Sequence, residues 1–588
     1  MRFIVAIVSF VVAFGMISYG LAQRTVLAEP DHVAASTALG TIAPVTVIEG
    51  SVLTANEGRQ KINISGSGQV FAAYGKTADV LAWVGDASYN RIQLDKVKST
   101  LTNSLVTGTE ATVPDPHGSD LWLAEFTREK DLTFVVNVPK DISVIIVSDG
   151  KEPAPGNVSI TWPVDNRTPW SGPLIVGGVL LLLAGLGLYL WALSNLRKVR
   201  GPRRRPPKMP KPPKRTKFSL TGYKAITAQR GRRSTGRASA VSAVLLTGVL
   251  VLTGCTAESW PEFLGGSAVV TPTPTPNPTE SGPPVTTDKP PVVNPSQLQS
   301  IISKIALVAL QADAERDSNL IKQRFDGPAL EFREANYAIR RADNSYQALP
   351  PIPSGSVEVT LPQQNDKWPR TVFAVVQDPK NPDVAPTALM LVQKTPRENY
   401  KVQYAVQLAA DVTMPALPAA NVGTQRLQPD AKIFALRPDE LALDYGDILN
   451  NGESSKYFKF FDTVNDSLVA SIGYEAKQKR LASIPAIAKM TLGTLAGAGD
   501  VIPMVTNDNG AIVAVYLNET ETVQPTEPGA VINAEGAVKS LSGVSSSTKG
   551  TIATYGDQLL FYVPSGVSDK KIRLIGWASA LIAAKELT

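Results

Sequence analysis

The sequence predicts a multidomain membrane protein in which transmembrane helices join an all-β sandwich outer domain to two tandem α+β domains. Three observations carry this prediction. Two apolar runs, one near the N-terminus and one over residues 174–193, have the length of membrane-spanning helices. Short segments of alternating hydrophobicity fill residues 45–165. From residue 296 onward, helical patterns are followed by strand patterns twice over.

Residues 1–22 are expected to form an N-terminal anchor or a signal peptide. The apolar run Phe3–Ala22 follows a single charge, Arg2. About 20 apolar residues span a bilayer, whereas the apolar region of a cleaved signal has about 7–15, so the run favours an uncleaved anchor. The small residues of Gly20-Leu21-Ala22 nevertheless suit a signal peptidase, which keeps cleavage open as the alternative.

Residues 45–165 are expected to form an extracytoplasmic β-sandwich. Clusters of Gly, Asn, Asp and Pro separate short strand patterns. The expected strands are 69–73, 79–84, 121–126, 132–138, 142–147 and 158–162. Trp83, Trp122 and Trp162 lie inside these patterns, which favours a place in the core over a carbohydrate-binding platform.

Residues 174–193 contain no charge and would span about 30 Å as a helix. Trp170 precedes the run, and Tyr189 and Trp191 lie near its far end, where aromatic side chains favour the membrane interface. Twenty uncharged residues favour a transmembrane helix over a buried core helix.

A basic cytoplasmic loop is expected at 197–237, where 16 Lys and Arg residues occur without a single Asp or Glu. Removing these 16 from the 58 basic residues leaves 42 against 52 acidic residues, a net charge of −10 for the rest of the chain. Interspersed prolines disfavour a folded nucleic-acid-binding arm, so no nucleic-acid partner is expected. Beside a membrane span, the loop predicts cytoplasmic retention and attraction to anionic lipid.

Residues 238–255 are expected to be a transmembrane or lipoprotein-signal segment. An apolar run follows several arginines and ends in Leu252-Thr253-Gly254-Cys255, which resembles a bacterial lipobox. The resemblance implies that Cys255, the only cysteine of the chain, is lipidated. An internal position is unusual for such a signal, and a third membrane span ending in a cysteine is the alternative.

Residues 256–295 are expected to be a Pro/Thr-rich tether, because Thr and Pro alternate over 271–276 and such tracts stay extended. With the basic loop in the cytoplasm, residues 23–170 and 256–588 are both expected outside. The protein is thus predicted to sit in the cytoplasmic membrane with most of its chain extracytoplasmic.

The first α+β domain is expected over 296–420. One helix begins at Ser296, a suitable N-cap, and a second begins near Pro328. Strands are expected at 357–361, 371–377, 387–393 and 400–408. The last strand is predicted to present Tyr400, Val402, Tyr404, Val406 and Leu408 on one face.

The second α+β domain is expected over 430–588 and repeats this order. Helices at 438–449 and 454–481 precede a hairpin turn at 507–510. Its strands are expected at 501–506, 511–517, 551–563 and 571–583.

Helices followed by a curved antiparallel sheet, twice over, resemble tandem nuclear-transport-factor-2-like, cone-shaped domains. The segments Leu389-Met390-Leu391-Val392-Gln393 and Tyr400-Lys401-Val402 resemble a family of uncharacterised actinobacterial membrane or lipoprotein envelope proteins. This resemblance covers roughly 297–588 and rests on strand patterns that contain no chemistry.

The sequence predicts no catalytic, cofactor-binding or metal-binding residue, and no cofactor. Its two histidines, His32 and His117, leave little room for histidine chemistry. Asp115, His117 and Asp120 could form a metal or proton-transfer site, but Asp115-Pro116-His117-Gly118 is also good turn chemistry. The other candidates suit a solvated helix face equally well: Asp326, Glu331 and Glu334 as acids, and Arg333, Arg340 and Arg341 as anion ligands.

Two functions therefore remain. The first is a non-catalytic, membrane-anchored cell-envelope protein, a scaffold or accessory binding factor at the outer face of the cytoplasmic membrane, whose partners are a cell-wall polymer, lipid or another membrane protein. The alternative is a carboxylate-dependent hydrolase or transferase acting on envelope glycan. Acidic residues converging in a pocket with raised pKa values would favour the enzyme.

Overall fold

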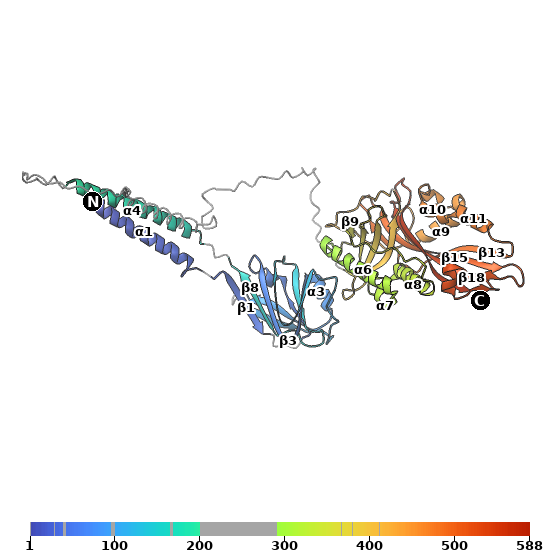
Figure 1. Ribbon diagram of the computed structural model, residues 1–588, viewed down its shortest axis with the longest axis horizontal. Coiled ribbons are helices and arrows are strands. Elements are labelled where there is room, and N and C mark those ends of the chain that lie inside the picture. The colour runs from blue at the N-terminus through green and yellow to red at the C-terminus, as the bar shows by residue number, and fades with distance from the viewer. Residues whose placement is uncertain are drawn as a thin grey trace, which may run out of the picture. The chain divides into compact units, whose positions relative to one another are not determined.

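In the computed structural model of the protein, the described residues are 2–28, 30–38, 43–95, 100–164, 168–199, 291–365, 367–378, 380–410 and 412–588. The chain divides into two units. Helices α1 (Arg2–Arg24) and α4 (Ser171–Val199) belong to one unit (Figure 1). Most of the β-rich region up to residue 160 and all described residues from 291 onward belong to the other.

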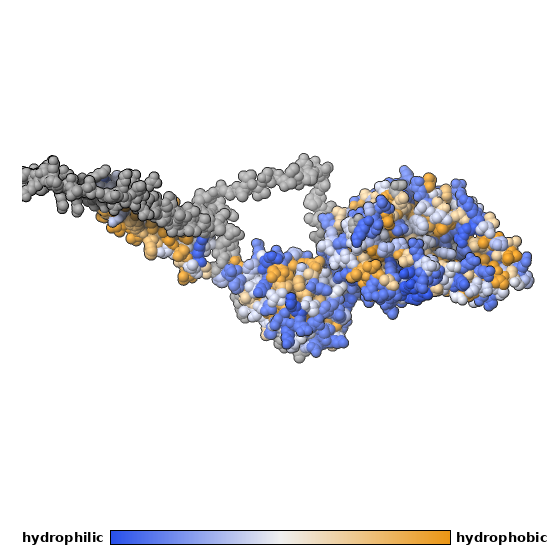
Figure 2. Space-filling view, viewed as in Figure 1, coloured by the Kyte–Doolittle hydropathy of each residue, from blue (hydrophilic) through white to orange (hydrophobic). Residues whose placement is uncertain are grey.

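Helices α1 and α4 form an antiparallel hairpin. At one end the ring of Phe3 meets Tyr189 edge-on, with ring centroids 5.8 Å apart. At the other end the Arg24 Nε donates a hydrogen bond to the Ser171 hydroxyl at 3.1 Å. Both helices are long and apolar enough to cross a membrane, and the visible surface of this hairpin is largely apolar (Figure 2).

Small residues bring the two helices close together. A Cβ atom at Gly178 would lie 2.7 Å from the Ile17 Cγ1 and 3.0 Å from the Ala13 carbonyl oxygen. Packing through small residues is the usual device of helices that associate within a membrane.

The N-terminal β-rich region is one eight-stranded sheet in the order β1-β8-β3-β7-β2-β4-β5, with β6 also paired to β3. The strands are β1 (His32–Ala38), β2 (Val45–Ile48), β3 (Gln60–Lys76), β4 (Tyr89–Asp95), β5 (Thr100–Val106), β6 (Ala124–Val136), β7 (Ile142–Val147) and β8 (Asn157–Pro163). Strands β2 and β4 run parallel, whereas β2 and β7 run antiparallel. As predicted, Trp83, Trp122 and Trp162 are buried.

The prediction of a strand at 79–84 is wrong, because this segment lies in helix α3 (Thr77–Val84). The helix buries Val80, Trp83 and Val84, while Leu81 is exposed. This spacing of three and four residues is helical, but a short apolar run matches either periodicity. A second short helix, α2 (Gly50–Leu53), also interrupts the region that the sequence predicted to be all-β.

The C-terminal region repeats helices followed by strands, as predicted. Its first half contains α6 (Pro295–Glu315), α7 (Ser318–Ile321), α8 (Gly327–Ala342), β9 (Val357–Pro362), β10 (Arg370–Val376), β11 (Thr387–Gln393) and β12 (Lys401–Leu408). Its second half contains α9 (Leu441–Asn451), two 3₁₀ turns, α10 (Ser467–Ile472), α11 (Tyr474–Ala482), β13 (Ala488–Ala496), β14 (Ile502–Val505), β15 (Ala511–Pro525), the short strands β16 (Ile532–Asn533) and β17 (Ser546–Ser547) around α12 (Gly536–Ser542), β18 (Thr551–Val563) and β19 (Arg573–Glu586).

Two helix boundaries differ from the prediction. Helix α6 is capped by Asn294, whose side chain accepts a hydrogen bond from the Gln297 N–H, so Ser296 lies inside the helix. The single helix expected at 454–481 is broken, because Asp466 caps α10 and Gly473 separates α10 from α11.

One nine-stranded sheet joins the two halves in the order β13-β15-β18-β19-β12-β11-β10-β9, with β14 paired to β15. The seam between the halves is narrow, since β12 pairs with β19 only through Gln407–Trp577 and Leu408–Gly576. Helices α6 and α8 pack on β10–β12 of the first half, and helix α9 packs on β15 and β18 of the second half (Figure 1). The opposite faces of both halves share one core that includes Phe373, Met390 and Tyr516.

The prediction that alternate residues of β12 lie on one face is wrong. The pairing of β11 with β12 shifts register between Met390 and Leu391, which is a β-bulge. Val402 therefore packs in the core under α6 and α8, whereas Tyr404 and Val406 pack in the shared core. A bulge adds one residue to one strand and moves the following side chains to the other face.

Candidate functional site

Three carboxylate–arginine pairs join the β-rich region to the C-terminal region within their common unit. Each carboxylate comes from the β-rich region and each arginine from the C-terminal region. The pairs are Asp79–Arg370 at 2.6 Å, Asp120–Arg324 at 2.5 Å and Glu110–Arg397 at 2.6 Å. The first two are buried, with side-chain exposures of 1% and 1% and of 0% and 7%. This charge-paired interface is the candidate functional site.

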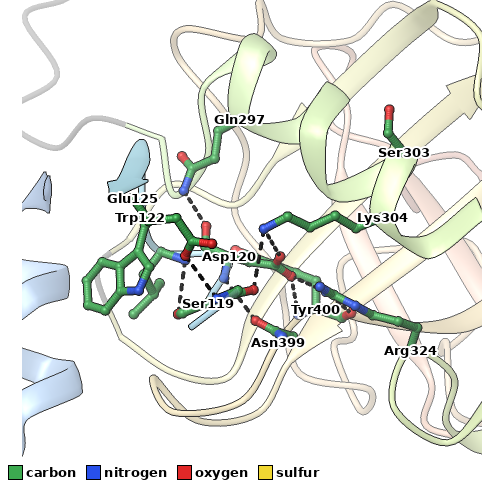
Figure 3. A network of polar contacts seen from close by, with 12 residues as sticks. Ser119, Asp120, Trp122, Glu125, Gln297, Ser303, Lys304, Arg324, Asn399 and Tyr400 are labelled. Atoms are coloured by element: carbon green, nitrogen blue, oxygen red, sulfur yellow. Dashed lines mark hydrogen bonds and ion pairs between the residues drawn. The ribbon is translucent and has the colours of Figure 1, made fainter. Parts of the chain in front are cut away.

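Asp120 is the centre of the best-connected part of the interface (Figure 3). Its Oδ2 accepts a hydrogen bond from the Arg324 Nη1 and another, at 2.9 Å, from the Tyr400 N–H. The Lys304 Nζ lies 3.8 Å from the other carboxylate oxygen. One carboxylate thus holds helix α6, the turn after α7 and the start of β12 together.

The backbone of Asp120 is held as well. Its N–H donates to the Asn399 Oδ1 at 2.9 Å, and its carbonyl oxygen accepts from the Gln297 Nε2 at 2.6 Å. Figure 3 shows Gln297 and Asn399 converging on Asp120 from different elements of the C-terminal region. The backbone N–H, the backbone carbonyl and the carboxylate of Asp120 are all bonded, so several separate contacts fix the orientation of this turn against the C-terminal region.

Helix α3 provides the second docking point. Asp79 in its first turn pairs with Arg370 at the start of β10. At its other end, Arg397 donates to the Trp83 carbonyl from Nε and to the Val84 carbonyl from Nη2, at 2.8 and 2.7 Å. A cation on the last carbonyls of a helix satisfies groups that have no partner within the helix.

Trp368 supports Arg370 at this docking point. The Arg370 guanidinium lies 3.8 Å from the Trp368 ring centroid, a cation–π geometry. The Trp368 Nε1 donates to the Gln393 Oε1 at 3.0 Å, and its ring packs against the core of the β-rich region. Trp368 therefore holds Arg370 in place from the side of the C-terminal region while it also contacts the β-rich region.

The predicted grouping of His117 with Asp115 and Asp120 is only partly present. The His117 Nδ1 lies 2.5 Å from the Asp115 Oδ1, and its Nε2 lies 3.1 Å from the Thr127 hydroxyl. The His117 N–H bonds the Asp115 carboxylate and lowers its pKa. Asp120 instead belongs to the interface, and no metal-ligating cluster of three acidic, His or Cys side chains occurs among the described residues.

The structure does not bring the three acidic candidates of the first α+β half into one pocket. Asp326 caps α8 and pairs with Lys394; burial raises its pKa, but the Lys394 and Gly327 hydrogen bonds outweigh this and lower it. Glu331 accepts a hydrogen bond from the Tyr516 hydroxyl, and Glu334 pairs with Lys322.

The three arginine candidates are engaged within the protein. Arg333 is 3% exposed and pairs with Asp313. Arg340 donates to the Asp313 carbonyl, and Arg341 donates to the Arg316 carbonyl. These contacts tie α8 to the end of α6.

Asp557 in β18 is a fully buried acid that was not among the predicted candidates. Burial raises its pKa to about 7, and the Glu519 charge adds to the shift, while the Ser579 hydroxyl and Lys477 oppose it. Lys477 pairs with Glu519 beside a cavity of 240 Å³ that both residues and Ser579 line. Burial also raises the pKa of Asp444 in α9 to about 6.

Most residues of the interface could not be recognised from the sequence. Arg324, Arg370 and Arg397 are ordinary in their local patterns, and only their partners in a distant region reveal their role. One usable signal was Trp368, a large aromatic residue two positions before an arginine. Cys255 and the segments 197–237 and 238–255 lie almost entirely outside the described residues, so their predicted roles stay predictions.

The protein is thus a chain with two apolar helices that could cross a membrane. Most of its β-rich region packs with its C-terminal α+β region as one unit. A family model described as a domain of unknown function (DUF8094) matches residues 289–586. Because the match covers half of the chain, the protein belongs to this family, which agrees with the expected uncharacterised family over this region. Comparison with curated proteins and with solved structures found no match.

We predict that Asp79→Leu or Arg370→Met alone destabilises the full-length protein in nanodiscs by ~3–5 kcal/mol, because each leaves a buried charge unpaired. The double variant should recover most of this loss, since two apolar side chains replace the pair. Chemical unfolding measures the free energy of unfolding of the unsubstituted protein, the two single variants and the double variant. Glu110→Gln, at the half-exposed pair, is the control and should cost at most ~1 kcal/mol. Additive losses in the double variant would contradict a direct pairing.

We predict that Asp557→Asn stabilises the protein at pH 8 but not at pH 4. The unfolded chain releases this proton near pH 4, whereas the folded protein keeps it until about pH 7, so the wild type loses stability as the pH rises across this window. At about 1.4 kcal/mol per pKa unit, the gain at pH 8 is at most ~4 kcal/mol. Melting temperatures between pH 4 and 8 test this; a gain independent of pH would exclude the titration of Asp557 as its cause.

Proposed function

We propose that the protein is a non-catalytic, membrane-anchored cell-envelope scaffold whose β-rich region and C-terminal region act as one body outside the cytoplasmic membrane. The charge-paired interface is the observation that carries this proposal. Two regions joined through buried pairs, 204 and 291 positions apart in the chain, have to lie on the same side of the membrane.

The helix hairpin supports the orientation. The β-rich region follows α1 and precedes α4, and the ends of both helices that adjoin it meet at Arg24 and Ser171. The opposite end of α4 leads into the 16 basic residues of 197–237. The positive-inside rule places that end in the cytoplasm and the β-rich region outside.

The interface then requires the chain to return to the outside between residues 199 and 291. The apolar segment 238–255 supplies this return, either as a third span or as a lipoprotein signal with Cys255 as the lipidated residue. The pairing of α1 with α4 favours a retained anchor over a cleaved signal, because cleavage near residue 22 would separate α1 from the rest of the chain.

We also propose the expected fold and origin of the C-terminal region. The order of helices and strands supports a nuclear-transport-factor-2-like ancestry of the two C-terminal halves. The proposed origin in an actinobacterial envelope rests on the resemblance of the segments 389–393 and 400–402 alone. As partners we propose anionic lipid at the basic loop and a cell-wall polymer or another membrane protein outside.

A carboxylate-dependent hydrolase or transferase acting on envelope glycan is the second candidate. The raised pKa of Asp557, beside Glu519 and a cavity of 240 Å³, is the observation that favours it. Groups with shifted pKa values concentrate at catalytic sites, but buried structural acids show them too. Asp557 is fully buried, which favours the structural role.

We predict that a cysteine replacing Leu105 in β5 and one replacing the exposed Val567 are both labelled by a membrane-impermeant maleimide in intact spheroplasts. A cysteine replacing Thr216 in the basic loop should react only after permeabilisation. The unsubstituted chain controls for Cys255. Labelling of Leu105→Cys without labelling of Val567→Cys would contradict the proposal, because the two regions would then lie on opposite sides.

A further inference from the structure

A cavity of 390 Å³ lies at the seam of the nine-stranded sheet. It opens where β12 leaves β19 after two residue pairs, and α8 and the segment 349–352 cover it. Next to the seam, the Ala405 N–H has no strand partner across the gap and donates instead to the Gln558 side-chain oxygen at 2.9 Å. The cavity is thus a product of the sheet's own geometry and falls within the size range of ligand sites, about 300–1,000 Å³.

The walls of this seam cavity are largely apolar. They are formed by Phe332, Leu349, Ile352, Val406, Leu408 and Trp577, with small residues between them. The small residues Ala329, Ala405 and Ala578 keep the space open, because larger side chains at these positions would fill it.

The seam cavity offers no charge for a ligand. Its one charged lining residue, Arg333, is neutralised by Asp313 and also donates to the Pro350 carbonyl at 3.4 Å. Gln558 is 1% exposed and lines the cavity; its side-chain oxygen accepts from the Ala405 N–H, so its side-chain nitrogen is the group that can donate to a ligand. Thr387, Gln407, Ser467 and Ser579 also line the cavity. A bound molecule therefore meets mostly apolar walls and a few uncharged polar groups, of which Gln558 lies at the seam itself.

We propose that the seam cavity binds the aliphatic chain of an uncharged amphiphile, with the carbonyl or hydroxyl oxygen of its head accepting a hydrogen bond from Gln558. A charged head would lose hydration without gaining a counter-ion. A sugar would leave most of its hydroxyl groups against apolar walls. The proposal deepens the scaffold function by naming a ligand class; it rests on that function only for the source of the ligand, which is either a membrane lipid chain or a free amphiphile.

The test uses full-length protein in nanodiscs and two probes with the same diazirine-bearing chain. One is a monoacylglycerol added from solution, and the other is a diacylglycerol, equally uncharged, supplied in the bilayer. After irradiation, mass spectrometry locates the labelled peptides. We expect saturable labelling of peptides from α8, β12 and β19. Labelling by the bilayer probe identifies a membrane lipid as the source, and labelling by the monoacylglycerol alone identifies a free amphiphile.

Two variants that fill the cavity, Ala405→Phe and Ala578→Phe, should weaken labelling at these peptides roughly tenfold. Ala482→Phe, at an exposed position of α11, is the matched control and should label like the unsubstituted chain. Labels confined to α1 and α4 would overturn the proposal, as would equal labelling of the filled variants. The location of the label in the unsubstituted chain decides the question even if a filled variant does not fold. If the cavity is not labelled but the maleimide experiment still finds both regions outside the membrane, the ligand proposal fails and the scaffold proposal stands.

Discussion

The structure of the larger unit depends on the requirement that a charge removed from water be matched by another. Asp79 and Arg370 are 1% exposed each, and Asp120 is fully buried against Arg324. Such pairs add little net stability over apolar contacts, but either partner alone is costly. They therefore act as specificity devices: the β-rich region docks on the C-terminal region in the one arrangement that pairs all its buried charges. Helix α3 and the turn at Asp120 fix that arrangement at two separate points.

Local pattern was sufficient to predict many elements from the sequence, although strands β1, β2, β4, β5 and β13 were not predicted and β6 was predicted as two strands. The apolar runs, the strand at 142–147 and the repeated helix–strand order required only periodicity. The errors arose where tertiary context decides. Thr77–Val84 is too short for periodicity to separate helix from strand, and the bulge at Gln403 in β12 changes the face of the following side chains without any marker in the composition. The joining of both C-terminal halves in one sheet depends on two residue pairs of β12 and β19, which no local signal announces.

The candidate site was far less predictable than the fold. Asp120 drew attention only as a neighbour of His117, whereas its partners are Arg324, Lys304 and Tyr400. An interface between regions separated by an apolar and a proline-rich segment leaves no spacing rule in a single sequence. The same holds for Asp557, whose raised pKa follows from burial between strands and from Glu519 on the neighbouring strand. Residues with local roles, such as the caps Asn294 and Asp326, lay within or beside the helix starts that were predicted.

The central claim is that the two regions form one body, and the distance between them measures this most directly. Spin labels on Leu105→Cys and Val384→Cys, both exposed, can be introduced into full-length Cys255→Ser protein in nanodiscs. Pulsed electron–electron double resonance then gives the distribution of distances between the two labels. We predict one narrow distribution that broadens when Arg324→Met and Arg370→Met are added. A broad distribution in the protein with all its charge pairs intact would contradict the account, because the β-rich region and the C-terminal region would then move independently.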